Sequence, residues 1–178
     1  MHAYLYLRAQ PGKLDDVVID LHGIHGVRHA VAVVGEWDAM AALEGADFRA
    51  IARAILTEVH RVEGVTRTYT APVVPLELVG VTGERVPLPL QGVGRPACYV
   101  HLDVQAGAVG EVARTLAATP EVAGVAVLAG QYDVLAELST DWEHASRIIL
   151  ERIHTIPGVR STNTLVAVPG VEDDDAGM

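Results

Sequence analysis

The sequence contains nearly the same unit twice, and this repetition restricts the folds open to the chain. Gly35-Glu36-Trp37-Asp38 returns as Gly130-Gln131-Tyr132-Asp133, ninety-five positions later, and the register holds without a gap from Ala3 to Leu43. One residue is then lost, and at an offset of ninety-four the residues His60, Gly64, Thr68 and Thr70 match His154, Gly158, Thr162 and Thr164. So long a repeat in a chain of 178 residues indicates two duplicated domains rather than a solenoid of short units.

Each copy is predicted to have the order βαββαβ. In the first copy, residues 4–8 alternate as a strand does, Pro11-Gly12 end that strand, and apolar residues then recur at helical spacing. Strands at 27–34 and 38–43 form a hairpin, and a second helical stripe and a last strand ending near Val74 follow. Right-handed crossovers place both helices on one face of a four-stranded antiparallel sheet. The sequence therefore predicts an α+β protein with two tandem ferredoxin-like domains.

The predicted domains are residues 1–74 and 97–169, joined by a Pro/Gly-rich linker at 75–96 and followed by an acidic, disordered tail at 170–178. Within the linker, residues 79–86 around Thr82-Gly83 are an open candidate for a short hairpin. The strand at 27–34 is apolar without interruption from Ala30 onward, so both faces of the sheet require burial. The free sheet face is therefore expected to pack on another sheet, most simply that of the sister copy, as in dimeric α+β barrels.

Composition excludes several classes of function. The net charge of -10 argues against binding to nucleic acid or to an anionic membrane surface, both of which require clustered Arg and Lys. Cys98 is the only cysteine, so neither a disulfide framework nor a thiolate metal site is expected. No apolar stretch approaches the length of a membrane span, and the first residues do not have the pattern of a signal peptide. A cytoplasmic location is expected.

The hairpin aspartates, Asp38 and Asp133, are the best candidates for ligand contact. Both persist after an aromatic residue, while the neighbouring Glu36 and Gln131 differ. A carboxylate beside an aromatic wall suits a small ligand that carries an amino group. An Asp after a Gly turn also commonly caps backbone N–H groups, and this alternative stays open.

Hydroxyl and imidazole groups are weaker candidates. Thr162 and Thr164 lie on one face of the last strand, as β-propensity alone would explain, or as donors to a ligand carboxylate. His22, His25 and His29 have no counterparts in the second copy and straddle a helix end, a loop and a strand, so no metal site is predicted. No phosphate loop, nucleophile elbow or zinc motif is present, and no cofactor is predicted.

The pattern resembles the effector-binding half, or RAM domain, of the Lrp/AsnC (feast/famine) regulators. The resemblance is carried by Gln10-Pro11-Gly12-Lys13-Leu14, by the two Gly-x-aromatic-Asp turns, and by the closing segments at 64–70 and 156–164. It implies binding of an amino acid or related metabolite through the hairpin loop, and assembly into dimers and rings. Two departures matter: the helix-turn-helix of the family is missing from this sequence, and Trp37 replaces the usual Tyr.

These observations together predict a non-enzymatic sensing protein that binds a small metabolite, does not bind DNA, self-associates, and acts through a full-length Lrp/AsnC regulator as a possible partner. The expected ligand-binding residues are Gly35, Trp37, Asp38, Gly130, Gln131, Tyr132, Asp133, Thr162 and Thr164. One alternative is a small enzyme of the dimeric α+β-barrel type, a monooxygenase or isomerase, with a pocket between sheet and helices, and His101 is its one hint. Another is a tandem ACT-like amino-acid-binding module, supported by Gly12 and Gly107 after the first strands.

Overall fold

The chain forms two compact units. The structure is a computed structural model that describes residues 1–83, 85–92 and 96–170. The first unit is formed by Met1–Thr70 and the segment that begins at Val166, and the second by Ala71–Leu165. The tail expected at 170–178 lies, apart from Gly170, outside the described residues. Within the described part of the chain, no helix is long and apolar enough to cross a lipid bilayer.

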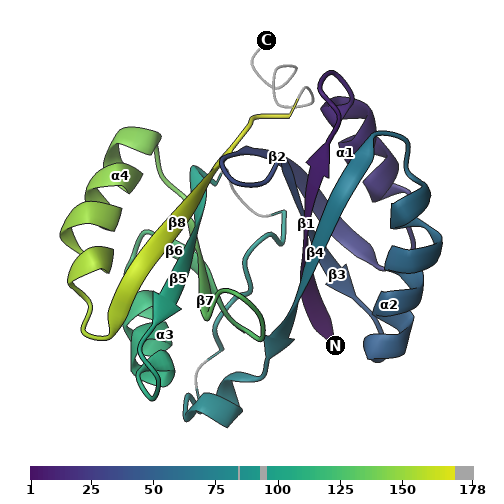
Figure 1. Ribbon diagram of the computed structural model, residues 1–178. Helices are drawn as coiled ribbons and strands as arrows, with labels where there is room; N and C mark the ends of the chain where they lie inside the picture. The colour runs from purple at the N-terminus through teal and green to yellow at the C-terminus, as the bar shows by residue number, and fades with distance from the viewer. Residues whose placement is uncertain (84, 93–95, 171–178) are drawn as a thin grey trace. The chain divides into compact units, whose positions relative to one another are not determined.

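The first copy has the predicted order of elements (Figure 1). Strand β3 pairs antiparallel with both β1 and β2. Strand β4 lies beside β1, where the hydroxyl of Thr66 donates to the carbonyl oxygen of Arg8 at 3.1 Å. The elements are β1 (His2–Ala9), α1 (Leu14–His22), β2 (Val27–Val34), β3 (Ala39–Glu44), α2 (Phe48–Thr57), the short helix η1 (Val59–Arg61) and β4 (Val65–Val74).

The second copy repeats this order, with its sheet arranged β8-β5-β7-β6. Its elements are β5 (Cys98–Val104), α3 (Val109–Ala117), β6 (Val122–Leu128), β7 (Val134–Leu138), α4 (Trp142–Glu151), η3 (Ile153–Thr155) and β8 (Val159–Ala167). The prediction of an α+β protein with two βαββαβ repeats is confirmed. The last strand of each copy, β4 or β8, ends in residues that pair with a strand of the other copy. The end of β4 pairs with β6 at Leu128 and Val127, and the end of β8 pairs with β2 at Val33 and Val34.

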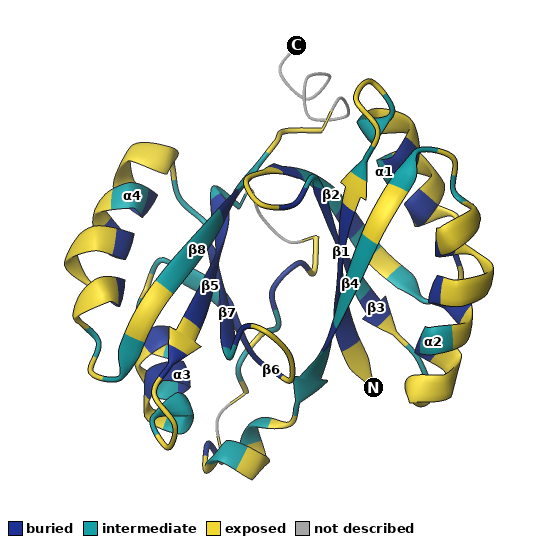
Figure 2. Ribbon diagram, in the orientation of Figure 1, coloured by how far each residue is buried: buried dark blue, intermediate teal, exposed yellow. Residues whose placement is uncertain are grey.

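Each sheet buries one face against its own pair of helices. In the first unit, the strand residues Leu5 and Leu7 pack with Val17 and Leu21 of α1 and with Ile51 of α2. In the second unit, alternate residues of β5 pack in the same way against α3 and α4. Figure 2 shows the sheet-facing sides of the helices as buried and their outer sides as exposed. The amphipathic stripes that predicted the helices therefore form the two cores.

The same capping residue begins the second helix of both copies. The carboxylate of Asp47 accepts the backbone N–H of Ala50 at 2.8 Å, and Asp141 accepts that of His144 at 2.8 Å. An Asp at this position satisfies one of the N–H groups that the first turn of a helix leaves without a partner. The caps fix where α2 and α4 start and hence which of their faces meets the sheet.

The described residues of the linker belong to the second unit. The open candidate for a hairpin at 79–86 is not formed in the described residues: a short helix, η2 (Leu76–Val79), is followed by residues 80–83 and 85–86, none of which belongs to a strand, and residue 84 lies outside the described residues. Residues 87–90 of the linker then lie beside β6 and β7. The N–H of Val125 donates to the carbonyl of Pro87 at 2.9 Å, and the N–H of Leu90 donates to the carboxylate of Glu137 at 2.7 Å. Burial raises the pKa of Glu137, and the hydrogen bond from Leu90 partly offsets that rise.

Candidate functional site

The hairpin aspartates hold the turn against the first strand of their copy. The backbone N–H of Asp38 donates to the carbonyl of Leu7 at 2.9 Å, and its Oδ2 accepts the N–H of Ala9 at 2.9 Å. Asp133 makes the matching pair of bonds, to the carbonyl of Leu102 at 3.0 Å and from the N–H of Val104 at 2.8 Å. Both side chains are half-buried. The capping role that the sequence left open is therefore present in both copies.

Capping uses one oxygen of each carboxylate. For the Oδ1 atoms of Asp38 and Asp133, the described residues provide no hydrogen-bond partner. The glycines that precede them, Gly35 and Gly130, lie exposed in the turns, as does Gln131. A ligand amine that approaches the turn would therefore meet an oriented carboxylate oxygen without breaking the bond that holds the strand.

In the first unit, the aromatic residue before the aspartate belongs to a cluster of three rings. The indole of Trp37 is only 2% exposed. It stacks on the ring of Tyr69 from β4, with an interplanar angle of 20° and 6.0 Å between centroids, and meets the ring of Tyr6 from β1 at 45° and 6.0 Å. The guanidinium carbons of Arg8 and Arg67 lie 5.8 Å and 5.5 Å from the centroid of Trp37.

In the second unit, the equivalent positions have different chemistry. Tyr132 replaces Trp37, and its ring centroid lies 4.7 Å from that of His101, which replaces Tyr6. Nδ1 of His101 is 3.3 Å from the carbonyl oxygen of Asn163, and because a carbonyl only accepts, Nδ1 carries the proton. Burial lowers the pKa of His101 to about 4, so the ring is neutral at pH 7.

The predicted threonines face away from the aromatic cluster. Oγ1 of Thr162 lies 2.8 Å from Nε2 of His154, and the first copy repeats this contact between Thr68 and His60 at 3.0 Å. Neighbouring residues of a strand point to opposite faces, and Tyr69 faces Trp37. Thr68 and its counterpart Thr162 are therefore directed to the other side of the sheet, as is Thr164 two residues further on.

The residues that contact Trp37, namely Tyr6, Arg8, Arg67 and Tyr69, were not predicted from the sequence. Nor was Asn163 of the second unit, whose carbonyl oxygen lies 3.3 Å from Nδ1 of His101. The signal was available in part, because Tyr6 and Arg8 alternate along β1 with Leu5 and Leu7, which enter the core. Residues at alternate positions of β1 and β4 must share the sheet face that is opposite the helices.

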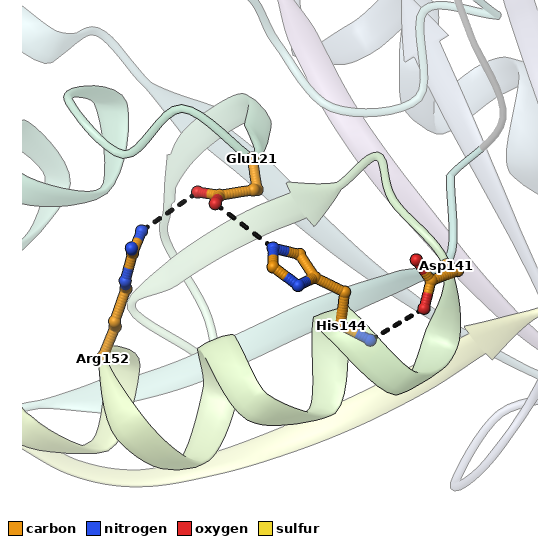
Figure 3. Close-up of polar contacts among 4 residues, drawn as sticks. All are labelled: Glu121, Asp141, His144 and Arg152. Carbon is orange, nitrogen blue, oxygen red and sulfur yellow. Dashed lines mark hydrogen bonds and ion pairs between the residues drawn. The ribbon is translucent and has the colours of Figure 1, made fainter.

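A second polar cluster lies on the surface of the second unit, away from the hairpin (Figure 3). The carboxylate of Glu121 accepts Nη1 of Arg152 at 3.1 Å and lies 3.3 Å from Nε2 of His144. Backbone and His144 hydrogen bonds, with the charge of Arg152, lower the pKa of Glu121. The first copy has Gly26 and Ala50 at the places of Glu121 and His144, so this network ties α4 to the start of β6 only in the second copy.

Two of the histidines considered as metal ligands, His22 and His29, are in contact with each other. The rings of His22 and His29 meet edge to face with centroids 5.7 Å apart, and Nδ1 of His22 is bonded to the carbonyl of Val18 at 2.8 Å. Burial and the neighbouring His22 lower the pKa of His29. Across the positions that the structure describes, no three His, Cys, Asp or Glu side chains are grouped as metal ligands would be.

Each copy thus has a ferredoxin-like βαββαβ fold and a Gly-x-aromatic-Asp hairpin whose aspartate accepts a backbone N–H of the first strand. The family model of the Lrp/AsnC ligand binding domain matches residues 2–75 and again 97–176, and the chain belongs to this family.

Among curated proteins, the HTH-type transcriptional regulator FL11 of Pyrococcus horikoshii is 33% identical over 70 residues, covering 39% of this chain and 46% of that protein. An uncharacterized HTH-type transcriptional regulator of Pyrococcus abyssi is 30% identical over 69 residues, covering 38% and 44%. The chain thus spans about half the length of the curated relatives that it matches. Among solved structures, the siroheme decarboxylase NirDL has the same fold with a TM-score of 0.67 at 15% identity, over 95% of this chain and 71% of that one.

Proposed function

We propose that this chain senses a small metabolite, an amino acid or a related compound, through the hairpin turns of its two copies. The observation that carries the proposal is the repeated geometry of Asp38 and Asp133, each fixed by one oxygen while the other has no partner among the described residues. An ammonium group there would gain a charge-assisted hydrogen bond. Support comes from the family, whose domain is a ligand-binding one, and from relatives that are named transcriptional regulators.

The sensing role is non-enzymatic in this proposal, and the signal passes to a partner. A full-length regulator of the Lrp/AsnC type is the expected partner, reached by self-association of like domains. Gly35, Trp37, Gly130, Gln131 and Tyr132 form the turns and their aromatic walls. Thr162 and Thr164, which point to the other side of the sheet, are not needed for contact with a ligand at the turn.

A second candidate function, an enzyme, is favoured by one observation. His101 is 1% exposed, neutral and in contact with the ring of Tyr132, an arrangement able to take up a proton from a substrate. The decarboxylase fold match is compatible with this reading at the level of the fold alone. His101 lies on the sheet face opposite the helices, however, because its neighbours Val100 and Leu102 enter the apolar core between sheet and helices. The pocket expected for an α+β-barrel enzyme between those layers is filled by that core.

Exchanging each hairpin aspartate for asparagine tests the sensing role. Asparagine keeps an oxygen that accepts the strand N–H and loses the negative charge. In a thermal-shift screen of the twenty amino acids and common catabolites, a ligand at one hundred times its dissociation constant adds about 2.7 kcal/mol to the stability of the parent protein. Asp38→Asn or Asp133→Asn is expected to weaken binding of that ligand by about 1.5–3 kcal/mol, the range of a charge-assisted hydrogen bond. The melting temperature without ligand should stay close to that of the parent.

The control for this exchange is Asp16→Asn, which removes an exposed carboxylate of α1 in the first unit. It should leave binding unchanged. Asparagine variants of both hairpins that bind the ligand as the parent does would show that the carboxylates only hold the turns.

The chain is expected not to bind DNA. Its net charge of -10 opposes the neutralisation of phosphates that supplies most non-specific affinity. A mobility-shift assay at low salt is the severe test, since electrostatic binding is strongest there. A shift that disappears as salt is raised would contradict this part of the proposal.

A further inference from the structure

The two hairpin sites differ in charge at matching positions. Arg8 and Arg67, which flank Trp37 in the first copy, correspond to Asp103 and Ser161 in the second. The repeat is otherwise close at the turn, where both aspartates make the same bonds to the strand backbone. The change therefore concerns what surrounds the aromatic ring and not how the turn is built.

The two arginines gather at one ring without an acidic partner. Both side chains belong to exposed residues, and no carboxylate among the described residues lies within ion-pair distance of either guanidinium. This is notable in a chain with 23 acidic and 13 basic residues, where other arginines, such as Arg28 and Arg152, do find carboxylates. A guanidinium stacked on an indole keeps its N–H edge available for a planar oxyanion.

Trp37 itself adds a donor. Trp37 is only 2% exposed, and its Nε1 atom is buried. This N–H has no hydrogen-bond acceptor among the described residues. Buried N–H groups without acceptors are uncommon in native proteins. An acceptor atom brought by a ligand would satisfy this one. The rings of Tyr6 and Tyr69 complete an apolar wall around the indole.

We propose that the first copy alone binds an aromatic carboxylate at Trp37, with Arg8 and Arg67 holding the carboxylate and the ring cluster contacting the apolar part. The inference rests on the proposed function, because it takes the hairpin as the ligand site and assigns its chemistry. In the second copy, the carboxylate of Asp103 repels the same ligand, and neither Ser161 nor the neutral His101 supplies a positive charge. The duplicated domains have thus diverged into one site for an anion and one without that selectivity.

Ligand binding at this site can be measured by the fluorescence of Trp37. The chain has two tryptophans, and Trp142 is on α4 in the second unit, so a Trp142→Phe background leaves Trp37 as the only indole. Benzoate is the probe, and benzamide and benzylamine are its neutral and cationic controls. We expect a saturable change in emission with benzoate only, and calorimetry should give one benzoate per chain.

Arg8→Gln and Arg67→Gln should each lower the affinity for benzoate at least about tenfold, because each removes one charge-assisted hydrogen bond to the carboxylate. The matched control is Arg53→Gln, an exposed arginine of α2 in the same unit. Circular dichroism of each variant confirms that the fold is kept. The assignment is overturned by no saturable change with benzoate, by equal binding of benzamide, by two benzoates per chain, or by unchanged affinity in both hairpin arginine variants.

The outcomes separate this assignment from the broader sensing role. Suppose that a metabolite from the thermal-shift screen requires the hairpin aspartates for binding, yet binds to the Arg8→Gln and Arg67→Gln variants as tightly as to the parent. This result would support the sensing role and refute the carboxylate site. Benzoate binding that needs both arginines but is unaffected by Asp38→Asn supports the carboxylate site and refutes the role of Asp38.

Discussion

Replacing Gly124 with alanine is expected to lower the free energy of unfolding by about 1–3 kcal/mol, the usual cost of overpacking a tight site. A Cβ at this position would lie 2.7 Å from the backbone nitrogen of Pro89 and 2.8 Å from the carbonyl carbon of Leu88. Both contacts are with backbone, so no side-chain rotation relieves them. The linker would have to move away from β6, and the 2.9 Å bond between Val125 and Pro87 and the 2.7 Å bond between Leu90 and Glu137 would be strained or lost.

Urea denaturation followed by circular dichroism measures this change. The control is Gly23→Ala at the end of α1, where the backbone has φ of -81° and an added Cβ would meet only the carbonyl oxygen of Asp20, at 3.4 Å. That substitution should leave the midpoint almost unchanged. A Gly124→Ala protein as stable as the parent would show that the linker is not held on β6.

The docking of the linker could not be predicted from composition. Its prolines and glycines are typical of a flexible tether, and that pattern says nothing about what the segment contacts. The repeat held a partial clue, because Gly124 stands where the first copy has His29, and Glu137 stands where it has Ala42. A small residue and a buried acid appear together only in the copy that the linker covers. Their meaning becomes clear only when the backbone of residues 87–90 is placed beside them.

The order of elements was predictable because each signal was local. Apolar residues at helical spacing defined α1 and α2, and alternation defined β1. Pairing of the ends of β4 and β8 was not local. Val73 meets Leu128 and Val33 meets Ala167, pairs far apart in sequence that no periodicity indicates. Apolar residues at these strand ends showed only that burial was needed.

The repeated build of the turn was predictable from the sequence, whereas the residues packed around it were not. Persistence of Asp38 and Asp133 in both copies singled out the carboxylates, and their backbone bonds explain why the pattern survived duplication. The repeat could not indicate Arg8 and Arg67, because the second copy has Asp103 and Ser161 at their positions. Thr162 was selected because it is repeated, yet its hydroxyl contacts His154.

Removing a hairpin carboxylate altogether should cost more stability in the second copy than in the first. Asp133→Ala leaves the N–H of Val104, on a residue that is 5% exposed, without its acceptor, and a buried donor left without an acceptor costs about 1–3 kcal/mol. Asp38→Ala does the same to the N–H of Ala9, but Ala9 is only half-buried, so water can replace part of the lost bond. Asparagine at either position should recover most of the loss, because it restores an acceptor oxygen.

Comparison of alanine with asparagine at Asp133 then separates the two roles of one side chain. Stability, measured by thermal unfolding without ligand, depends on the acceptor oxygen. The parent and Asp133→Asn should therefore be equally stable, and both should be more stable than Asp133→Ala. Ligand affinity depends on the negative charge of the carboxylate, so both variants should bind the ligand more weakly than the parent, and to a similar extent. If the alanine variant unfolded at the parent temperature, the 2.8 Å bond to Val104 would not be holding the turn, and the carboxylate would have persisted for its ligand alone.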